Sequence, residues 1–507
     1  MSKHLQNSLG RILVILIAAI IEVFVLVSVF VWFYDKAAWI TLILSVSGII
    51  ITLGIIKNSR HLSFDVMWIV LILLFPISGA IVYLFLGANL LISKTFKKIK
   101  RATEEAFRYY PRDNGVLEEA KEEYPEAKGQ FEYISTNTGF PFYKNRDFRY
   151  YGLGELGFPK MLEELKKAER FIFLEYFIID KGEMWNSILE ILEEKAKNGV
   201  DVRVMYDDLG SFFLLPVNYY KTLEEKGIKC VPFNRINPIL NIIINHRDHR
   251  KIMVIDGKVA FSGGINLADE YINVTHPYGK WKDNVIMVKG EAVWSYTVMF
   301  LTHWNALKPT DEDFYAFKVK TRSRKQDGYI APYGETPLDD EMSSQNIYLN
   351  ILNGARDYCY IFTPYLIIDT EMINTLILSA KRGVDVRLIT PGIPDKKIIY
   401  AITRSYYRQL IEGGVKIIEY TPGFVHAKVF VADDIVATVG TINLDYRSLY
   451  LHFENGTYLY GSKVVEEIRD DLLEAMAEGH EVTLDKSRRP FIYELIMSFL
   501  RLFAPLM

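Results

Sequence analysis

Two segments of the chain carry histidine and lysine at one repeated spacing. The first is His249-Arg250-Lys251 with Asp256 after four further residues, and the second is His426-Ala427-Lys428 with Asp433 after four. An imidazole beside an ammonium, supplied twice, suits a phosphate group. One imidazole can attack phosphorus while the other protonates the leaving alcohol. The sequence therefore predicts phosphoryl chemistry with His249, Lys251, His426 and Lys428 as the central catalytic residues.

The chain has nine histidines in all, and only these two sit in an H-x-K pattern. On a strand, such spacing directs the histidine and the lysine to the same side. Asn266 and Asn443 follow the motifs at matching places and are predicted, with the lysines, to hold the phosphate oxygens. Because the lysines neutralise the phosphate charge, we expect no metal and no other cofactor.

Four carboxylates accompany the motifs. A nucleophilic histidine needs a carboxylate to orient its ring. Asp283 follows the first motif and Glu454 follows the second, each at the entry to a new apolar stretch, and both are predicted to fill that role. Asp256 and Asp433 complete the motifs, but each precedes an apparent turn. We expect these two to fix the turn or the strand end rather than to touch substrate.

The elements around the motifs are also repeated. An apolar run at 170–180 precedes a helix-like stretch and the sequence Gly-Val-Asp-Val-Arg at 199–203. The same order recurs at 358–369 and 383–387. Each copy precedes one of the two H-x-K motifs. Strand, helix and strand in this order are typical of βαβ units with parallel strands. We therefore predict an α/β fold of two homologous halves, at 136–315 and 325–482, that form one bilobal catalytic unit.

The charged residues are spread very unevenly. Residues 1–90 hold eight of the 121 and have a net charge of +2, within a chain of net charge −3. Their three apolar runs, 12–34, 38–56 and 66–86, are each long enough to cross a bilayer. The sequence therefore predicts a membrane anchor of two to three transmembrane helices at 1–90. A basic flank and linker follow at 91–135.

The five basic residues after the third run favour a cytoplasmic globular part on a multi-pass cell-membrane protein. They are Lys94, Lys97, Lys98, Lys100 and Arg101. The globular part is acidic overall, which disfavours nucleic acid as a partner. Residues 487–507 are apolar with basic flanks, which predicts a C-terminal helix lying in the membrane interface or packed on the domain. Two cysteines exclude a disulfide framework, and oligomeric state cannot be read from the sequence.

The paired motifs resemble those of the phospholipase D superfamily. The segments 245–251, 420–428 and 440–448, with the hydrophobic N-terminus, narrow the resemblance to its bacterial cardiolipin synthases. This resemblance covers the chain from about residue 38 to the end. It implies two phospholipase D-like α/β/α halves and reversible phosphatidyl transfer between two phosphatidylglycerol molecules, with release of glycerol. It also implies a phosphohistidine intermediate, with His249 often taken as nucleophile and His426 as general acid and base.

Three alternatives stay open on the sequence. The same site could serve a hydrolytic phospholipase D or another phosphatidyltransferase. A nuclease of the same fold is disfavoured by the membrane runs and the acidic charge. A non-catalytic membrane scaffold is disfavoured by two intact motifs. The residues alone do not order the two histidines. Phosphatidylglycerol, other anionic phospholipids and the membrane are the expected partners.

Overall fold

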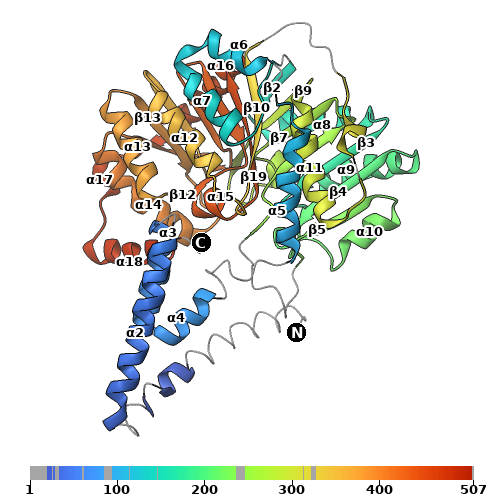
Figure 1. Ribbon diagram of the computed structural model, residues 1–507. Helices are drawn as coiled ribbons and strands as arrows, with labels where there is room; N and C mark the ends of the chain where they lie inside the picture. Colours follow the sequence, from blue (N-terminus) through green and yellow to red (C-terminus); the bar gives the residue numbers. More distant parts are fainter. Residues whose placement is uncertain are drawn as a thin grey trace. The chain divides into compact units, whose positions relative to one another are not determined.

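The computed structural model of the chain describes residues 20–25, 27–28, 34–59, 62–84, 94–112, 115–144, 147–235, 246–311, 313–320 and 327–504. These residues belong to two compact units. Unit 1 comprises 1–93, 236–245 and 502–506. Unit 2 comprises 94–235, 246–501 and 507 (Figure 1). Both H-x-K motifs lie in unit 2.

Unit 2 contains two large β-sheets. The first has the strand order β2-β9-β7-β6-β3-β4-β5. Its strands are β2 (Asp147–Tyr151), β3 (Phe171–Tyr176), β4 (Asp201–Asp207), β5 (Lys229–Phe233), β6 (Lys251–Ile255), β7 (Val259–Gly263) and β9 (Val285–Lys289). Strands β3, β4 and β5 run parallel, and β6, β7 and β9 join antiparallel.

The second sheet repeats this plan. Its order is β1-β10-β19-β17-β16-β11-β13-β14-β20. Its strands are β1 (Tyr143–Lys144), β10 (Tyr329–Glu335), β11 (Tyr358–Phe362), β13 (Asp385–Pro391), β14 (Lys416–Tyr420), β16 (Val429–Ala432), β17 (Val436–Gly440), β19 (Glu454–Tyr460) and β20 (His480–Glu481). The run β19-β17-β16-β11-β13-β14 matches β9-β7-β6-β3-β4-β5 strand for strand, with the same parallel and antiparallel pairs. The predicted repeat is thus an α/β unit present twice.

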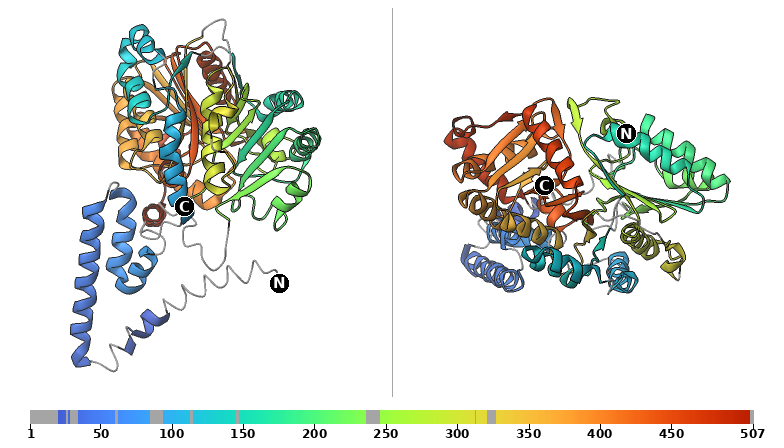
Figure 2. Two further views of the ribbon diagram at one scale, coloured as in Figure 1. Left: turned by 45° about the vertical axis from the view of Figure 1, so that its right-hand side comes forward. Right: turned by 90° about the horizontal axis from the view of Figure 1, so that it is seen from above.

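Helices cover both faces of each sheet (Figures 1 and 2). In the first half they are α8 (Gly154–Lys166), α9 (Glu183–Lys197), α10 (Tyr219–Glu225) and α11 (Val293–Leu307). In the second half they are α12 (Ser343–Gly354), α13 (Thr370–Lys381), α14 (Lys397–Glu412) and α16 (Val464–Ala477). The predicted strand–helix–strand units are β3–α9–β4 and β11–α13–β13.

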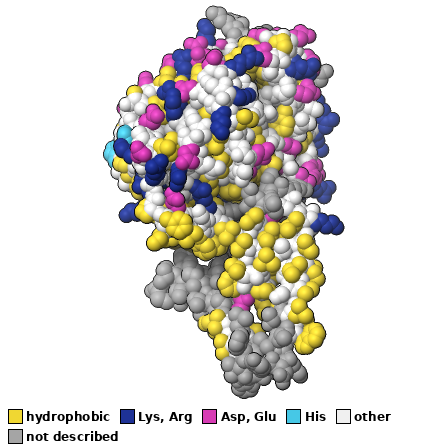
Figure 3. Space-filling view, turned by 90° about the vertical axis from the view of Figure 1, so that its left-hand side faces the viewer, with side chains coloured by type: hydrophobic (Ala, Val, Ile, Leu, Met, Phe, Trp, Pro, Cys, Tyr) yellow, Lys and Arg dark blue, Asp and Glu magenta, His cyan; other side chains and the backbone are white. Residues whose placement is uncertain are grey.

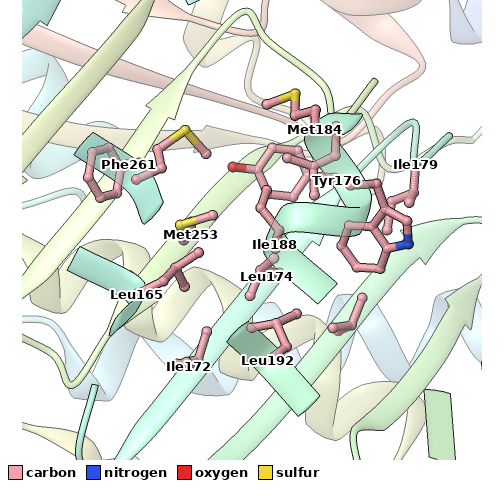
Figure 4. Close-up of a cluster of buried hydrophobic side chains, with 14 of the residues drawn as sticks. Leu165, Ile172, Leu174, Tyr176, Ile179, Met184, Ile188, Leu192, Met253 and Phe261 are labelled. Carbon is pink, nitrogen blue, oxygen red and sulfur yellow. The ribbon is translucent and has the colours of Figure 1, made fainter. Parts of the chain in front are cut away.

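The core of the first half shows why strand β3 reads as an unbroken apolar run. Ile172 and Leu174 are fully buried and pack in one cluster with Ile188 and Leu192 of α9 (Figure 4). Residues on the other side of the strand, such as Phe173, are also buried, against α11. A strand covered on both faces has no polar face, so its sequence does not alternate.

Residues 94–135, predicted as a flank and linker, are part of unit 2. Helix α5 (Lys94–Ala106) packs against α11 and buries Phe96 and Ile99. Helices α6 (Val116–Glu123) and α7 (Lys128–Glu132) follow, and Phe131 and Ile134 are fully buried. The mean polarity of the segment hides a narrow apolar stripe at helical spacing, which is enough to dock each helix.

Unit 1 contains α2 (Tyr34–Asn58), α3 (Leu62–Leu74) and α4 (Pro76–Val82) around a small core of Ile55, Met67, Trp68 and Ile72. Hydrophobic side chains also cover much of its surface (Figure 3). Among the described residues, no helix meets the length and apolarity needed to cross a membrane. The predicted transmembrane helices are therefore not supported.

Each predicted span has its own outcome. The run 38–56 lies in α2. The run 66–86 is divided between α3 and α4. Proline has no amide hydrogen and interrupts the helix at Pro76, and residues 85–86 lie outside the described residues. Most of the run 12–34 also lies outside them.

Candidate active site

The two motif histidines lie just before the strands that were predicted to carry them. Strand β6 begins at Lys251 and β16 at Val429, so His249 and His426 precede regular pairing. Their backbone N–H groups donate instead to carbonyls of the opposite half. His249 donates to Phe453 at 2.9 Å, and His426 donates to Lys282 at 2.7 Å. Each histidine is thereby fixed by both halves.

The orienting carboxylates are exchanged between the halves. The Nδ1 atom of His249 lies 2.8 Å from Glu454 Oε2, and His426 Nδ1 lies 2.6 Å from Asp283 Oδ2. Both carboxylates were predicted from their place after the motif of their own half, and each serves the histidine of the other half. The exchange follows from the backbone contacts, because Phe453 and Lys282 immediately precede these two acids.

Burial sets the charge of the two imidazoles. It lowers the pKa of His249 well below its usual value, with Lys251 and His452 acting in the same direction. It lowers the pKa of His426 to about 4, with Lys428 adding to the effect and Asp283 opposing it. Both rings are therefore neutral near pH 7. A carboxylate at Nδ1 favours the tautomer with hydrogen on Nδ1, which leaves the Nε2 lone pair available for chemistry.

The two motif lysines lie beside the histidines. Lys251 Nζ donates to the His249 carbonyl at 2.7 Å, and Lys428 Nζ lies 2.8 Å from His426 Nδ1. Burial lowers the pKa of Lys251 to about 7 and that of Lys428 to about 8, although Glu454 and Asp283 counteract it. A buried ammonium with so low a pKa gains most from an anionic ligand. This favours the predicted role of both lysines at a phosphate.

The motif aspartates hold backbone together. Asp256 accepts hydrogen bonds from the N–H groups of Glu169, Arg170 and Phe171 at the start of β3, at 2.8–3.0 Å. Asp433 accepts from Arg356, Asp357 and Tyr358 at the start of β11, at 2.7–3.0 Å. Both aspartates adopt a left-handed backbone with φ of 54°. These contacts match the predicted function at the strand ends.

The two predicted phosphate-binding asparagines have different surroundings. Asn266 accepts from the Ile178 N–H at 3.1 Å and donates to the Tyr271 hydroxyl at 2.7 Å, so its amide already has protein partners. Asn443 is 6% exposed, and its Oδ1 has no hydrogen-bond partner among the described residues. Phosphate binding by these asparagines stays a prediction.

A third histidine at the site was missed by the sequence reasoning. The ring of His452 lies 5.7 Å from that of His249, and Trp281 lies 5.6 Å from His426 in the same way. His452 and Trp281 each stand two residues before the orienting carboxylate of their half. An alignment of Trp-Lys-Asp-Asn with His-Phe-Glu-Asn would have found this pair. Neither ring nitrogen of His452 has a hydrogen-bond partner within the described part of the chain.

Two groups of described residues have the types and spacing that could hold a metal ion. One is His249, His452 and Glu454, and the other is Glu175, Asp248 and His303. Lys251 and Lys428 lie next to the cluster of His249, His452 and Glu454, and their positive charge opposes binding of a cation there. In the second, Glu175 and His303 already contact each other at 3.0 Å. That catalysis needs no metal stays a prediction.

Comparisons with known proteins agree on the class. The pattern of the family described as "Cardiolipin synthase, PLD-like domain" matches residues 161–304 and 348–476, one range within each half. In the solved phosphatidylserine synthase of Haemophilus influenzae, 98% of the chain superposes on 74% of this one, with a TM-score of 0.57 and 16% identity. The fold is that of the phospholipase D superfamily.

Sequence relatives narrow the class to one family. The cardiolipin synthase of Halalkalibacterium halodurans is 32% identical over 92% of this chain and 93% of its own length. Cardiolipin synthase 2 of Bacillus anthracis is 32% identical over 91% and 90%. An uncharacterized protein of Streptococcus mutans is 46% identical over 87% and 96%. The chain belongs to the cardiolipin synthase family with phospholipase D-like domains.

Proposed function

We propose that the protein is a cardiolipin synthase that transfers a phosphatidyl group from one phosphatidylglycerol to another and releases glycerol. The observation that carries the proposal is the pair of neutral histidines, each held at Nδ1 by a carboxylate of the opposite half. Such a pair suits a double displacement at one phosphorus. Membership of the cardiolipin synthase family supports phosphatidylglycerol as the substrate.

The first step forms a covalent intermediate. The Nε2 atom of one histidine attacks the phosphorus of phosphatidylglycerol, forming a P–N bond as the P–O bond to glycerol breaks. The second histidine, protonated in the substrate complex because the phosphate charge favours imidazolium, gives its proton to the departing glycerol oxygen. Lys251 and Lys428 stabilise the charge on the non-bridging oxygens.

The second step restores the enzyme. The second histidine, now neutral, removes the proton from a hydroxyl of another phosphatidylglycerol. That oxygen attacks phosphorus, and the P–N bond breaks to release cardiolipin. The carboxylates Glu454 and Asp283 keep each ring oriented through both steps and stabilise the imidazolium that forms.

We further propose that the enzyme works at the cell membrane, with unit 2 on the cytoplasmic face. The exposed apolar side chains of unit 1, such as Leu42, Ile50 and Leu53 of α2, support membrane attachment. The exposed basic residues of α5, among them Lys97 and Lys98, support the cytoplasmic side. Proteolysis of sealed membrane vesicles of known orientation tests this. Cleavage in unit 2 of right-side-out vesicles would contradict it.

The reaction is tested with the pure protein and phosphatidylglycerol as the only lipid, with products identified by mass. Cardiolipin and glycerol in equal amounts are expected. Phosphatidic acid without cardiolipin would show hydrolysis instead, and absence of any product would leave only a scaffold. Both results would contradict the proposal.

A further inference from the structure

The C-terminal helix α18 (Phe491–Leu502) presents an apolar stripe to the outside. Its exposed large side chains follow helical spacing, and each is between 49% and 77% exposed: Phe491, Ile492, Leu495, Ile496 and Phe499. Figure 3, which faces this side of the molecule, shows hydrophobic side chains gathered along this edge of unit 2 with Lys and Arg above them. Exposed contiguous apolar surface of this kind marks an interaction site.

The opposite side of α18 is fixed to unit 2. Met497 is 8% exposed, and Arg408 of α14 donates to Glu494 at 3.0 Å. The guanidinium of Arg501 lies 4.0 Å from the centre of the Tyr406 ring, and its Nε donates to Ser405 Oγ at 2.7 Å. The helix is therefore docked by polar and aromatic contacts, and these contacts leave its apolar stripe outward.

A pocket rich in arginine lies between α14 and α18, with a volume of about 210 Å³. Of its four arginines, Arg404 and Arg408 pair with glutamates. Arg489 and Arg501 have no carboxylate within ion-pair distance among the described residues. Arginine binds phosphate through two parallel N–H groups. Arg501 already donates to Ser405 and contributes its positive charge, so Arg489 is the guanidinium that can bind a phosphate anion in this way.

We propose that α18 and this pocket form a docking site for the surface of an anionic phospholipid membrane. The apolar stripe lies among the acyl chains near the interface, and the pocket takes the phosphate of one headgroup. Charge complementarity with Arg489 and Arg501 selects anionic over neutral lipid. This site lies outside the catalytic centre and goes beyond the proposed function, because it holds unit 2 at the membrane without taking part in transfer.

The test uses the full chain with a single reporter. Cys230 and Cys359 are both buried, so Ile496→Cys offers a selective position for a dye whose emission reports apolar surroundings. The His249→Ala background prevents consumption of lipid, so the result does not depend on whether the protein is a cardiolipin synthase. Phosphatidylglycerol is titrated into detergent micelles, and the mole fraction at half-maximal emission shift is measured.

We expect a shift with phosphatidylglycerol and little with phosphatidylcholine. Arg489→Gln should raise the half-maximal mole fraction about five-fold, the factor for one basic residue at an anionic surface. Its matched control is Lys197→Gln, an exposed cation of α9 whose side chain is 69% exposed. Leu495→Ser should also weaken the response, whereas Leu378→Ser, at a similarly exposed position of α13, should not.

Three results would overturn the proposal. Equal shifts with phosphatidylcholine and phosphatidylglycerol would remove the anionic selectivity. An unchanged half-maximal mole fraction in Arg489→Gln would show that the pocket does not bind the headgroup. A full shift with inorganic phosphate alone would make the site a receptor for free phosphate. Circular dichroism of each variant confirms that the fold is retained.

Discussion

The exchange of carboxylates between the halves makes a sharp prediction for Glu454→Gln. The carboxylate accepts from His249 Nδ1 at 2.8 Å, is fully buried, and also accepts from the Thr441 hydroxyl. The amide has nearly the same shape but no charge. If its NH₂ group faces Nδ1, it holds the ring in the tautomer that blocks Nε2. The His249 ring then loses both its orientation and the stabilisation of its imidazolium form.

The size of the effect follows from this geometry. Loss of the orienting carboxylate of a buried histidine typically costs about 10²- to 10⁴-fold in kcat, or about 3–5 kcal/mol of transition-state stabilisation. The free energy of unfolding, in contrast to kcat, should not fall in this variant. Burial raises the pKa of Glu454 well above its usual value, and Lys251 and Thr441 only partly oppose this. Above the unfolded-state pKa of about 4.3, ionisation therefore favours the unfolded chain. Glu454→Gln removes that cost, so unfolding at pH 7 should need at least as much denaturant.

Two measurements check this prediction. Turnover of phosphatidylglycerol by saturated enzyme gives kcat, and ¹⁵N spectra of labelled histidine rings give the tautomer of each ring. Glu454→Gln should change the ring signals of His249 and leave those of His426, and Asp283→Asn should do the reverse. A change at His426 in Glu454→Gln, or a kcat within tenfold of wild type, would refute the exchange.

The site makes three further predictions. Burial lowers the pKa of Lys251 to about 7 and that of Lys428 to about 8, so both ammonium groups lose their protons as pH rises through these values. The kcat/KM for phosphatidylglycerol should therefore fall above about pH 8, and a profile that is flat to pH 10 would contradict this. Asp433→Ala removes the acceptor of three backbone N–H groups and should lower the unfolding free energy by about 3 kcal/mol, measured by denaturant titration. The kcat of the enzyme that remains folded should change little, and an inactive variant of unchanged stability would place Asp433 at the substrate instead. His452→Phe keeps a ring against His249 and removes two buried nitrogens that make no hydrogen bond among the described residues, although Nδ1 lies 3.7 Å from Glu454 Oε1. The unfolding free energy should therefore stay equal or rise by about 1 kcal/mol, and a loss of about 2 kcal/mol or more would show that those nitrogens are satisfied.

Local sequence patterns predicted the repeated α/β fold well. The unbroken apolar run of β3 and the repeated Gly-Val-Asp-Val-Arg both reflect short-range constraints, namely burial on two faces and a turn before a parallel strand. The turn positions of Asp256 and Asp433 were readable for the same reason. Their left-handed backbone suits aspartate and is followed by Gly257 and Asp434.

Contacts between the halves could not be predicted from one half. Glu454 and Asp283 were recognised as partners of histidines, but their exchange depends on backbone pairing such as that of Gly423–Val425 with Lys280–Lys282. Distance along the chain holds no information on this. His452 was missed because a lone histidine has no motif of its own. Its equivalence to Trp281 becomes visible only when the two halves are aligned with each other, and the ring contacts show it directly.

The predicted spans are not supported among the described residues, and the third run shows one physical reason. Hydropathy summed over a window does not register a single helix break, and Pro76 divides the third run into α3 and α4. Mean polarity misled at 94–135 in the opposite sense, because a few apolar residues at helical spacing dock α5 on α11. In both places the pattern of individual residues decides the structure, and the average does not.

In the proposed mechanism, two histidines act on opposite sides of one phosphorus through a covalent intermediate. It is tested most directly by rapid acid-free quenching of the enzyme with phosphatidylglycerol, digestion, and mass spectrometry of the peptides that carry His249 and His426. A phosphatidyl group is predicted on one of these two histidines in the wild type, and neither His249→Ala nor His426→Ala should form cardiolipin. Cardiolipin formation by either variant, or steady turnover with no modified histidine at any time, would contradict this mechanism.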